Sequence, residues 1–307
     1  MAEAGQLHGV IAPVLTPFGE DGAPDQDRFI EHCEWLLAEG CTALAPFGTT
    51  SEAPSLGLDE RMELLDALVE AGIDPSRLMP GTGAPSLMDA IVLTEHAVDV
   101  GCAGVLVLPP YYFKQPSEEG IYRYYAELIE EVGDHRMRLY LYHIPQLTGV
   151  PLKPDLVARL ASDYPEVVVG LKDSSGNMAG TLELLARFPD LAIFPGSEAL
   201  LLEGLRHGAA GCISASANVA ARQIRALYDR YEAPEADELH AQVSRVRRAF
   251  ENVPLIPGLK ALVAHYRNDP QWRVLRPPLV ELELDEQRAL VAALDRDCDF
   301  RLVFPGV

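Results

Sequence analysis

Short apolar runs alternate with longer amphipathic stretches from the start of the chain to about residue 231, and this alternation restricts the fold more than any other feature. Successive runs begin roughly 20 to 36 residues apart, the length of one strand-and-helix unit. Such units form a parallel sheet covered by helices. Eight of them predict an α/β fold of the (β/α)8 (TIM) barrel type, which 307 residues can form as one unit. The runs begin near Val10, Thr42, Leu78, Val105, Leu139, Val167, Leu191 and Cys212.

The stretches between the apolar runs have helical periodicity. Between residues 25 and 39 the apolar side chains fall on one helical face, and Gly40 follows as a stop signal. Ser86 and Ser117 are predicted N-caps of the third and fourth helices. The predicted apolar face of the first helix consists of Phe29, Ile30, Cys33, Leu36 and Leu37.

After residue 231 the sequence becomes helix-like at about 234–251, 257–266 and 285–296, with prolines between these stretches. No low-complexity linker separates this part from the rest, which argues against an independent second domain. We therefore expect residues 1–231 to form the barrel that carries the active site. Residues 232–307 are expected to form a C-terminal helical extension packed on it.

Composition excludes several classes of function. A formal net charge of −21 disfavours nucleic acid as a partner, since binding of its phosphates needs clustered Lys and Arg. No apolar run approaches the roughly 20 residues that span a membrane, and the acidic N-terminus lacks the apolar core of a secretory signal. Five scattered cysteines favour reduced thiols and a cytoplasmic location. Zinc and nucleotide-phosphate motifs are absent, so we expect neither a metal nor a cofactor.

One apolar run, residues 167–171, ends on Lys172. Lysine is rare in this chain: only four of the 25 Lys and Arg residues are lysine. Arginine stays protonated and cannot attack a carbonyl carbon, whereas a lysine amine can once it loses its proton, which an apolar setting favours. The alternative is a strand-end lysine whose ammonium group reaches solvent.

Other strand ends carry polar or aromatic residues, and in a barrel the loops that follow the strands build the active site. Gly48, Thr49 and Thr50 form a turn whose amides can hold a carboxylate, although hydroxyl-rich turns are also common as plain turns. Aromatic residues at 111–113 favour a subunit interface or a ligand wall, with simple packing as the alternative. Residues 195–198 and 211–218 add hydroxyls and one carboxylate where a second substrate would lie.

Tyr142 ends the run that precedes the Lys172 run. Adjacent parallel strands lie about 4.8 Å apart, so Tyr142 is expected to approach Lys172 if the two ends are level. A phenol beside a nucleophilic amine can move protons while a carbonyl adduct forms and collapses. The alternative is a packed barrel tyrosine with a satisfied hydroxyl.

Six segments in this order resemble the dihydrodipicolinate synthase / N-acetylneuraminate lyase family. They are Gly9–Phe18, Gly48–Thr50, Pro110–Tyr112, Tyr142–Pro145, Gly170–Asp173 and Gly211–Ser214. The resemblance implies a (β/α)8 barrel that condenses or cleaves 2-oxo acids, usually pyruvate, through a lysine imine and without a metal. It also implies a homodimer or a homotetramer.

By motif match, the resemblance implies a role for each residue of the candidate site. Lys172 would form the imine, and Tyr142 would be the general acid/base. Thr49 would pass protons between tyrosines, and Tyr112 would cross into the neighbouring subunit to complete this relay. The implied substrate-binding residues are Thr50, Gly48, Ile213, Ser174, Gly196, Glu198 and Leu147.

The sequence departs from the family pattern at Leu147, where dihydrodipicolinate synthases usually carry an arginine that holds the carboxylate of the aldehyde substrate. Loss of a charge-assisted clamp argues against that reaction. An aliphatic residue resembles the sugar-acid lyases, and hydroxyls at 174, 197, 214 and 216 suit a polyhydroxylated partner. Ser51 and His143 replace the usual glycine and asparagine. The polar residues of the lysine-feedback site are replaced at 58, 61, 85 and 89, so inhibition by lysine is not expected.

The leading hypothesis is a Schiff-base lyase acting on pyruvate plus an aldehyde, or on a 2-oxo-3-deoxy sugar acid. A sugar-acid dehydratase that uses the same imine and a true dihydrodipicolinate synthase are alternatives in the same family. A barrel that binds ligands without catalysis is the alternative from another class.

Overall fold

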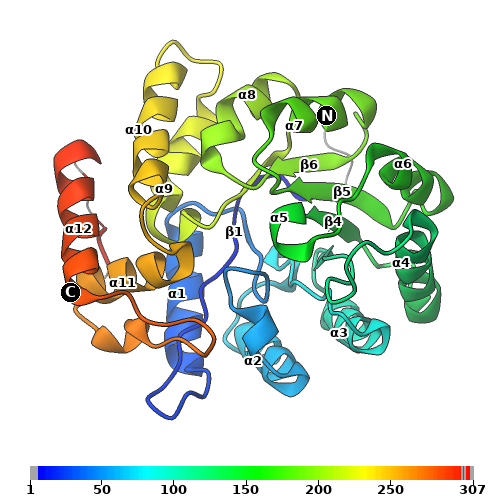
Figure 1. The fold of residues 1–307 in the computed structure, drawn as a ribbon, viewed down its shortest axis with the longest axis horizontal. Coiled ribbons are helices and arrows are strands. Elements are labelled where there is room, and N and C mark those ends of the chain that lie inside the picture. Colours follow the sequence, from blue (N-terminus) through cyan, green and yellow to red (C-terminus); the bar gives the residue numbers. More distant parts are fainter. Residues whose placement is uncertain (1–5, 299, 301, 305–307) are drawn as a thin grey trace.

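The computed structural model describes residues 6–298, 300 and 302–304. In this part of the chain, parallel strands form a central barrel with helices around it (Figure 1). The strands are β1 (Gly9–Ala12), β2 (Ala43–Leu44), β3 (Val105–Val107), β4 (Leu139–His143), β5 (Val168–Asp173), β6 (Ala192–Pro195) and β7 (Gly211–Ile213).

One barrel segment, residues 78–81, is not a regular strand. It joins β2 to β3 through the single parallel bridges Leu44–Leu78 and Gly81–Leu106. The order around the barrel is therefore β7, β1, β2, residues 78–81, β3, β4, β5 and β6. The barrel closes where the amide of Ala210, just before β7, donates to the carbonyl of Ile193 in β6 at 2.9 Å. The predicted (β/α)8 barrel is confirmed.

The helices of the barrel follow the predicted pattern. Ser86 and Ser117 cap α3 and α4 by accepting bonds from the amides of Asp89 and Gly120, as predicted. The barrel helices are α1 (Gln26–Ala38), α2 (Leu58–Glu70), α3 (Leu87–Val100), α4 (Glu118–Val132), α6 (Pro154–Asp163), α7 (Met178–Arg187), α8 (Leu201–Arg206) and α9 (Ala217–Asp229), with the short α5 (Pro145–Thr148) after β4.

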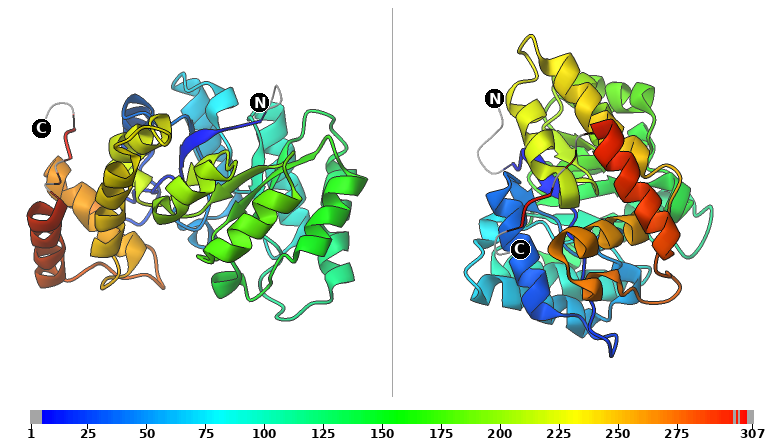
Figure 2. Two further views of the ribbon diagram at one scale, coloured as in Figure 1. Left: turned by 90° about the horizontal axis from the view of Figure 1, so that it is seen from above. Right: turned by 90° about the vertical axis from the view of Figure 1, so that its left-hand side faces the viewer.

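Three further helices, α10 (Ala236–Ala249), α11 (Leu255–Arg267) and α12 (Leu284–Cys298), follow α9 and lie together at one side of the barrel (Figures 1 and 2). α10 packs on α9, and α12 packs on both α10 and α11. These bounds agree with the helical stretches expected after residue 231. The division at residue 231 remains a prediction.

Inward-facing side chains fill the barrel. Because side chains alternate along a strand, Tyr140 and Tyr142 of β4 point into the barrel, whereas Leu139 and Leu141 point toward the helices. The interior cluster consists of Ile11, Ala43, Ala45, Met79, Leu106, Tyr140, Tyr142, Ile144, Val169, Ala192, Phe194 and Ile213. The helices cover the outer face of the strands and form the larger core.

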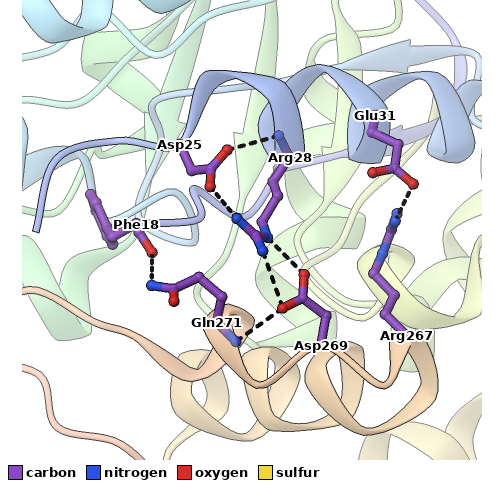
Figure 3. Close-up of polar contacts among 7 residues, drawn as sticks. All are labelled: Phe18, Asp25, Arg28, Glu31, Arg267, Asp269 and Gln271. Carbon is purple, nitrogen blue, oxygen red and sulfur yellow. Dashed lines mark hydrogen bonds and ion pairs between the residues drawn. The ribbon is translucent and has the colours of Figure 1, made fainter. Parts of the chain in front are cut away.

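The segment from α11 to the 3-10 helix η4 (Pro270–Arg273) is bound to α1 by polar contacts (Figure 3). Arg28 of α1 donates to Asp269 at 2.7 Å, and Arg267 pairs with Glu31 at 2.8 Å. Gln271 donates to the carbonyl of Phe18 at 2.9 Å. The C-terminal helices are thus held to the first helix of the barrel.

The buried face of α1 differs from the predicted one. Phe29, Cys33 and Leu36 are buried as predicted, and Ile30 and Leu37 are partly buried against the core. His32 and Trp35 are also buried, which was not predicted. The reason is tertiary packing: the His32 ring lies 4.9 Å from that of Trp272 in η4. Burial, with Arg267 as a second cause, lowers the pKa of His32 from 6.5 to about 3.

No helix in the described ranges is long and apolar enough to span a bilayer.

His32 should make the protein acid-sensitive. Its folded pKa is depressed, so between about pH 6.5 and pH 3 the unfolded chain binds a proton that the folded chain does not. This contribution to stability is present above about pH 6.5 and is lost as the pH falls, by up to about 1.4 kcal/mol per pH unit. His32→Gln should flatten the pH dependence of the unfolding free energy, measured by urea denaturation.

The matched control is His135→Gln, because the His135 side chain is 92% exposed. This variant should give a curve parallel to that of the wild type. Equal slopes for wild type and His32→Gln would show that His32 is not the group that binds a proton on unfolding.

Candidate active site

The register between β4 and β5 brings Tyr142 and Lys172 side by side. Their Cα atoms are partners in the ladder, and His143 is paired with Asp173. An irregularity between Leu139 and Tyr140 shifts the register. Gly170, the strand partner of Tyr140, lies two residues before Lys172. Residues two apart share a face of a strand, so Lys172 faces the inside of the barrel as Gly170 does. The predicted approach of Tyr142 to Lys172 is confirmed.

Lys172 is a buried amine at the mouth of the barrel. The residue is 4% exposed, and the Nζ atom lies 4.1 Å from the centroid of the Tyr142 ring. The strand-end lysine therefore does not reach solvent, which was the alternative considered from the sequence. An aromatic face beside the nitrogen and an apolar barrel beneath it restrict the access of water.

The turn after β2 reaches the same place. The hydroxyl of Thr49 lies 3.3 Å from the hydroxyl of Tyr142, so the two can exchange a proton through one hydrogen bond. Gly48 and Thr50, on either side of Thr49, are buried. A small cavity lies beside this pair and is lined by Phe47, Gly48, Thr49, Ala53, Pro54, Gly81, Gly83, Leu106, Leu108, Tyr111 and Tyr142.

Sequence reasoning missed Tyr111, which lines this cavity with Thr49 and Tyr142. Burial raises the pKa of Tyr111 above 10, and Arg61 opposes this effect. The aromatic run at 111–113 was the available signal, but it does not show which ring turns inward. Tyr112 turns outward: it is 74% exposed and contacts Phe113 edge-on.

The loops after β6 and β7 form the other side of the mouth. Glu198 is fully buried, with Oε2 accepting a hydrogen bond from Ser214 and Oε1 without a partner among the described residues. Ile213 ends β7 and is buried. Gly196 passes against Ser174, where a Cβ would lie 2.8 Å from the Ser174 Cα, so only glycine fits.

Asp173 is used structurally. It accepts bonds from the Thr181 hydroxyl at 2.6 Å and the Ser175 amide at 3.0 Å, and it is 1% exposed. Its strand partner His143 accepts a bond from the amide of Leu152 through Nδ1 at 3.1 Å. Burial lowers the pKa of His143 below 6.5, while the nearby Asp173 carboxylate raises it.

Leu147 lies on α5, directly after β4, and is 59% exposed. Tyr112 and Leu147 are thus exposed, whereas Lys172 is buried. The structure brings Lys172, Tyr142 and Thr49 together, whereas Tyr112 and Leu147 face outward on this single chain.

A second and larger hollow lies at the opposite end of the barrel. Its lining includes Arg138, Val168 and Leu191, which stand at the N-terminal ends of β4, β5 and β6. In TIM barrels that end contributes to stability, and the chemistry takes place at the C-terminal ends of the strands. The mouth that contains Lys172 is therefore the candidate active site.

The mouth of this (β/α)8 barrel contains a buried amine, a phenol and a hydroxyl. These are the groups that a lyase needs to form a Schiff base. Comparisons with known proteins agree with this class. The profile of the Dihydrodipicolinate synthetase family matches residues 6–297. An uncharacterised DapA-like lyase of Chloroflexus aurantiacus is 35% identical over 94% of this chain and 96% of its own length.

Solved structures give the same result. The crystal structure of dihydrodipicolinate synthase from Agrobacterium tumefaciens has a TM-score of 0.88 and 34% identity, covering 94% of this chain and 99% of that one. YagE from E. coli, solved in complex with pyruvate, has a TM-score of 0.86 and 25% identity over 94% of this chain and 98% of that one. The chain belongs to the dihydrodipicolinate synthetase family and is a class I aldolase-type lyase.

The pKa of His143 can be measured directly. We expect it to lie below 6.5 in an NMR titration, because burial outweighs the attraction of Asp173. Asp173→Asn should lower the pKa further, since it removes the negative charge that favours the imidazolium. A higher pKa in Asp173→Asn would contradict this assignment, and Asp155→Asn, at an exposed site, should leave His143 unchanged.

Proposed function

We propose that Lys172 forms an imine with the carbonyl carbon of a 2-oxo acid, most simply pyruvate. The observation that carries this proposal is the burial of the Lys172 amine against the Tyr142 ring, with the Tyr142 hydroxyl 3.3 Å from Thr49. Arginine in place of Lys172 could not do this chemistry, because it does not lose its proton. The pyruvate complex of YagE is consistent with the proposal.

The chemistry follows from the three side chains. The Lys172 amine adds to the carbonyl, and loss of water from the carbinolamine leaves a protonated imine. Tyr142 passes the protons in both steps, with Thr49 as its relay. The imine then accepts the electrons released when a proton leaves the neighbouring carbon. The resulting enamine attacks an aldehyde to form a carbon–carbon bond, and water finally releases the product from Lys172; the reverse sequence cleaves the bond.

The turn at Gly48 and Thr50 would hold the substrate carboxylate, because its amides and hydroxyl can donate hydrogen bonds to a negative group. Ile213 would contribute a backbone carbonyl beside the substrate. Holding the acid at both ends fixes its carbonyl toward the amine.

We propose that the enzyme works in the cytoplasm as a homodimer or homotetramer in which Tyr112 crosses to a neighbouring subunit. Tyr112 is 74% exposed on its own chain and lies next to the exposed ring of Phe113, so covering both rings would remove apolar surface from water. In this arrangement the hydroxyl of Tyr112 would join the relay of Tyr142 and Thr49 in the partner's site.

The second substrate is proposed to be a hydroxylated aldehyde, or its adduct with pyruvate, a 2-oxo-3-deoxy sugar acid. Glu198 has one buried carboxylate oxygen without a described partner, which suits a hydroxyl donor. Gly196, Ser174 and Leu147 complete the proposed surface for this substrate. A dehydratase with the same imine would leave the carbon chain intact.

The imine prediction is tested by borohydride reduction in the presence of pyruvate. We expect a covalent adduct by intact mass and its location at Lys172 by peptide mapping. Lys172→Ala should lose the adduct and reduce turnover by several orders of magnitude, because no other group supplies the nucleophile. Lys153→Ala is the control, since Lys153 is exposed and should leave both unchanged. A Lys172→Ala protein as active as wild type would exclude the mechanism.

Product analysis separates the substrate hypotheses. We expect pyruvate to appear from a 2-oxo-3-deoxy sugar acid, and no turnover with pyruvate plus aspartate semialdehyde, because leucine at position 147 cannot clamp a carboxylate. Several relatives are named 4-hydroxy-tetrahydrodipicolinate synthase, so turnover with aspartate semialdehyde would favour that reaction here. A new oxo acid with its carbon chain intact would identify a dehydratase.

A further inference from the structure

A second buried lysine lies close to the active-site turn. The side chains of Lys260, on α11, and Glu52, after β2, are both fully buried, and the Lys260 Nζ atom lies 2.6 Å from Glu52 Oε1. Lys260 also donates to the carbonyl of Val274 at 2.8 Å. Removing two charges from water costs free energy, which only good geometry compensates. We therefore expect this buried pair to have a specific role in the fold.

Glu52 closes the turn that carries Thr49 and Thr50. The turn has a non-glycine residue in the left-handed region at each end: Phe47 has a φ of 60° and Glu52 a φ of 57°. Such residues are strained and persist only when their surroundings hold them. The Glu52 amide donates to the Thr49 carbonyl at 3.1 Å, so a shift of Glu52 is passed directly to Thr49.

The turn is held from two sides. On the barrel side, the hydroxyl of Ser51 donates to the carbonyl of Val14, and Thr16 donates to the carbonyl of Ser51 at 2.8 Å. On the other side, the C-terminal segment holds the Glu52 carboxylate through Lys260 and through the amide of Arg276 at 3.2 Å. The second set of contacts comes entirely from residues that follow the barrel.

Lys260 is not placed to act as a nucleophile itself. Its amine is covered by the Phe18 ring, whose centroid lies 4.4 Å away, as well as by Glu52 and the carbonyl of Val274. Burial lowers the pKa of Lys260 from 10.5 to about 8, and Glu52 opposes this shift. The geometry therefore suits a fixed counter-charge.

We propose that Lys260 is a positioning residue of the active site: its buried ion pair with Glu52 holds the Thr49–Thr50 turn in the geometry that binds the carboxylate of the 2-oxo acid. This inference rests on the proposed function of that turn. It makes the C-terminal helices a part of the site, although none of their side chains is proposed to touch the substrate.

The α11 helix provides a matched control. Arg267, seven residues after Lys260, is also a poorly exposed cation paired with a glutamate, Glu31 of α1, at 2.8 Å (Figure 3). Both pairs bind α11 to the barrel, but Glu31 lies in a helix away from the turn. Loss of either pair should destabilise the protein, and only loss of the Lys260 pair should change substrate binding.

The test is the rate of borohydride trapping as a function of pyruvate concentration, for wild type, Lys260→Met, the double variant Glu52→Gln/Lys260→Met, and Arg267→Met. The double variant leaves no lone buried charge, so it keeps the test possible if Lys260→Met does not fold. Folding is checked by circular dichroism and thermal unfolding. We expect the half-saturating pyruvate concentration to rise about ten-fold or more in both Lys260 variants, with little change in the rate at saturation, because hydrogen bonds to a charged group are weakened.

Arg267→Met should have a lower melting temperature than wild type. Its half-saturating pyruvate concentration should equal that of wild type. The inference is overturned if the Lys260 variants keep the half-saturating pyruvate concentration of wild type. It is also overturned if Arg267→Met raises this concentration as much as the Lys260 variants do. If the wild-type enzyme itself gives no adduct with pyruvate, the proposed function fails first, and the inference falls with it.

Discussion

The pairing of β4 with β5 is the constraint on which the candidate site depends. It sets Tyr142 opposite Lys172 with both side chains at the mouth of the barrel. A slip of one residue would turn the side chains of one strand to the opposite face and separate the amine from the phenol. The irregularity at Leu139 and Tyr140 corrects the register just before the functional residues, while Gly170 leaves room for the Tyr140 ring beneath Lys172.

The features that were predictable from the sequence are those that depend on near neighbours in the chain. Apolar runs located the barrel segments, and serine at 86 and 117 located two helix starts. Lys172 and Tyr142 could be paired because parallel strands with equal ends place their last residues together. One segment, residues 78–81, was predicted as a strand but makes only single bridges, because Pro80 has no amide hydrogen to donate to the ladder.

The features that were missed depend on partners distant in the sequence. His32 and Trp35 look like exposed residues of α1 until Trp272 packs on His32 and Phe304 packs on Trp35, both more than 200 residues later. Tyr111 and Tyr112 are identical neighbours, and only the folded loop shows which one faces the cavity. The pair of Glu52 with Lys260 was invisible for the same reason: helical periodicity predicts α11 but does not tell which strand end it touches.

The lysine content has a practical consequence for chemical labelling. Two of the four lysines, Lys172 and Lys260, are buried, whereas Lys114 and Lys153 are exposed. The exposed pair lies on one face: Lys114 donates to the carbonyl of Thr148, and Lys153 lines the hollow between residues 115–121 and 149–153. Tyr112 is two residues from Lys114 in the same loop. Cross-linkers that react with side-chain amines will therefore report on this face alone, which includes the loop of Tyr112.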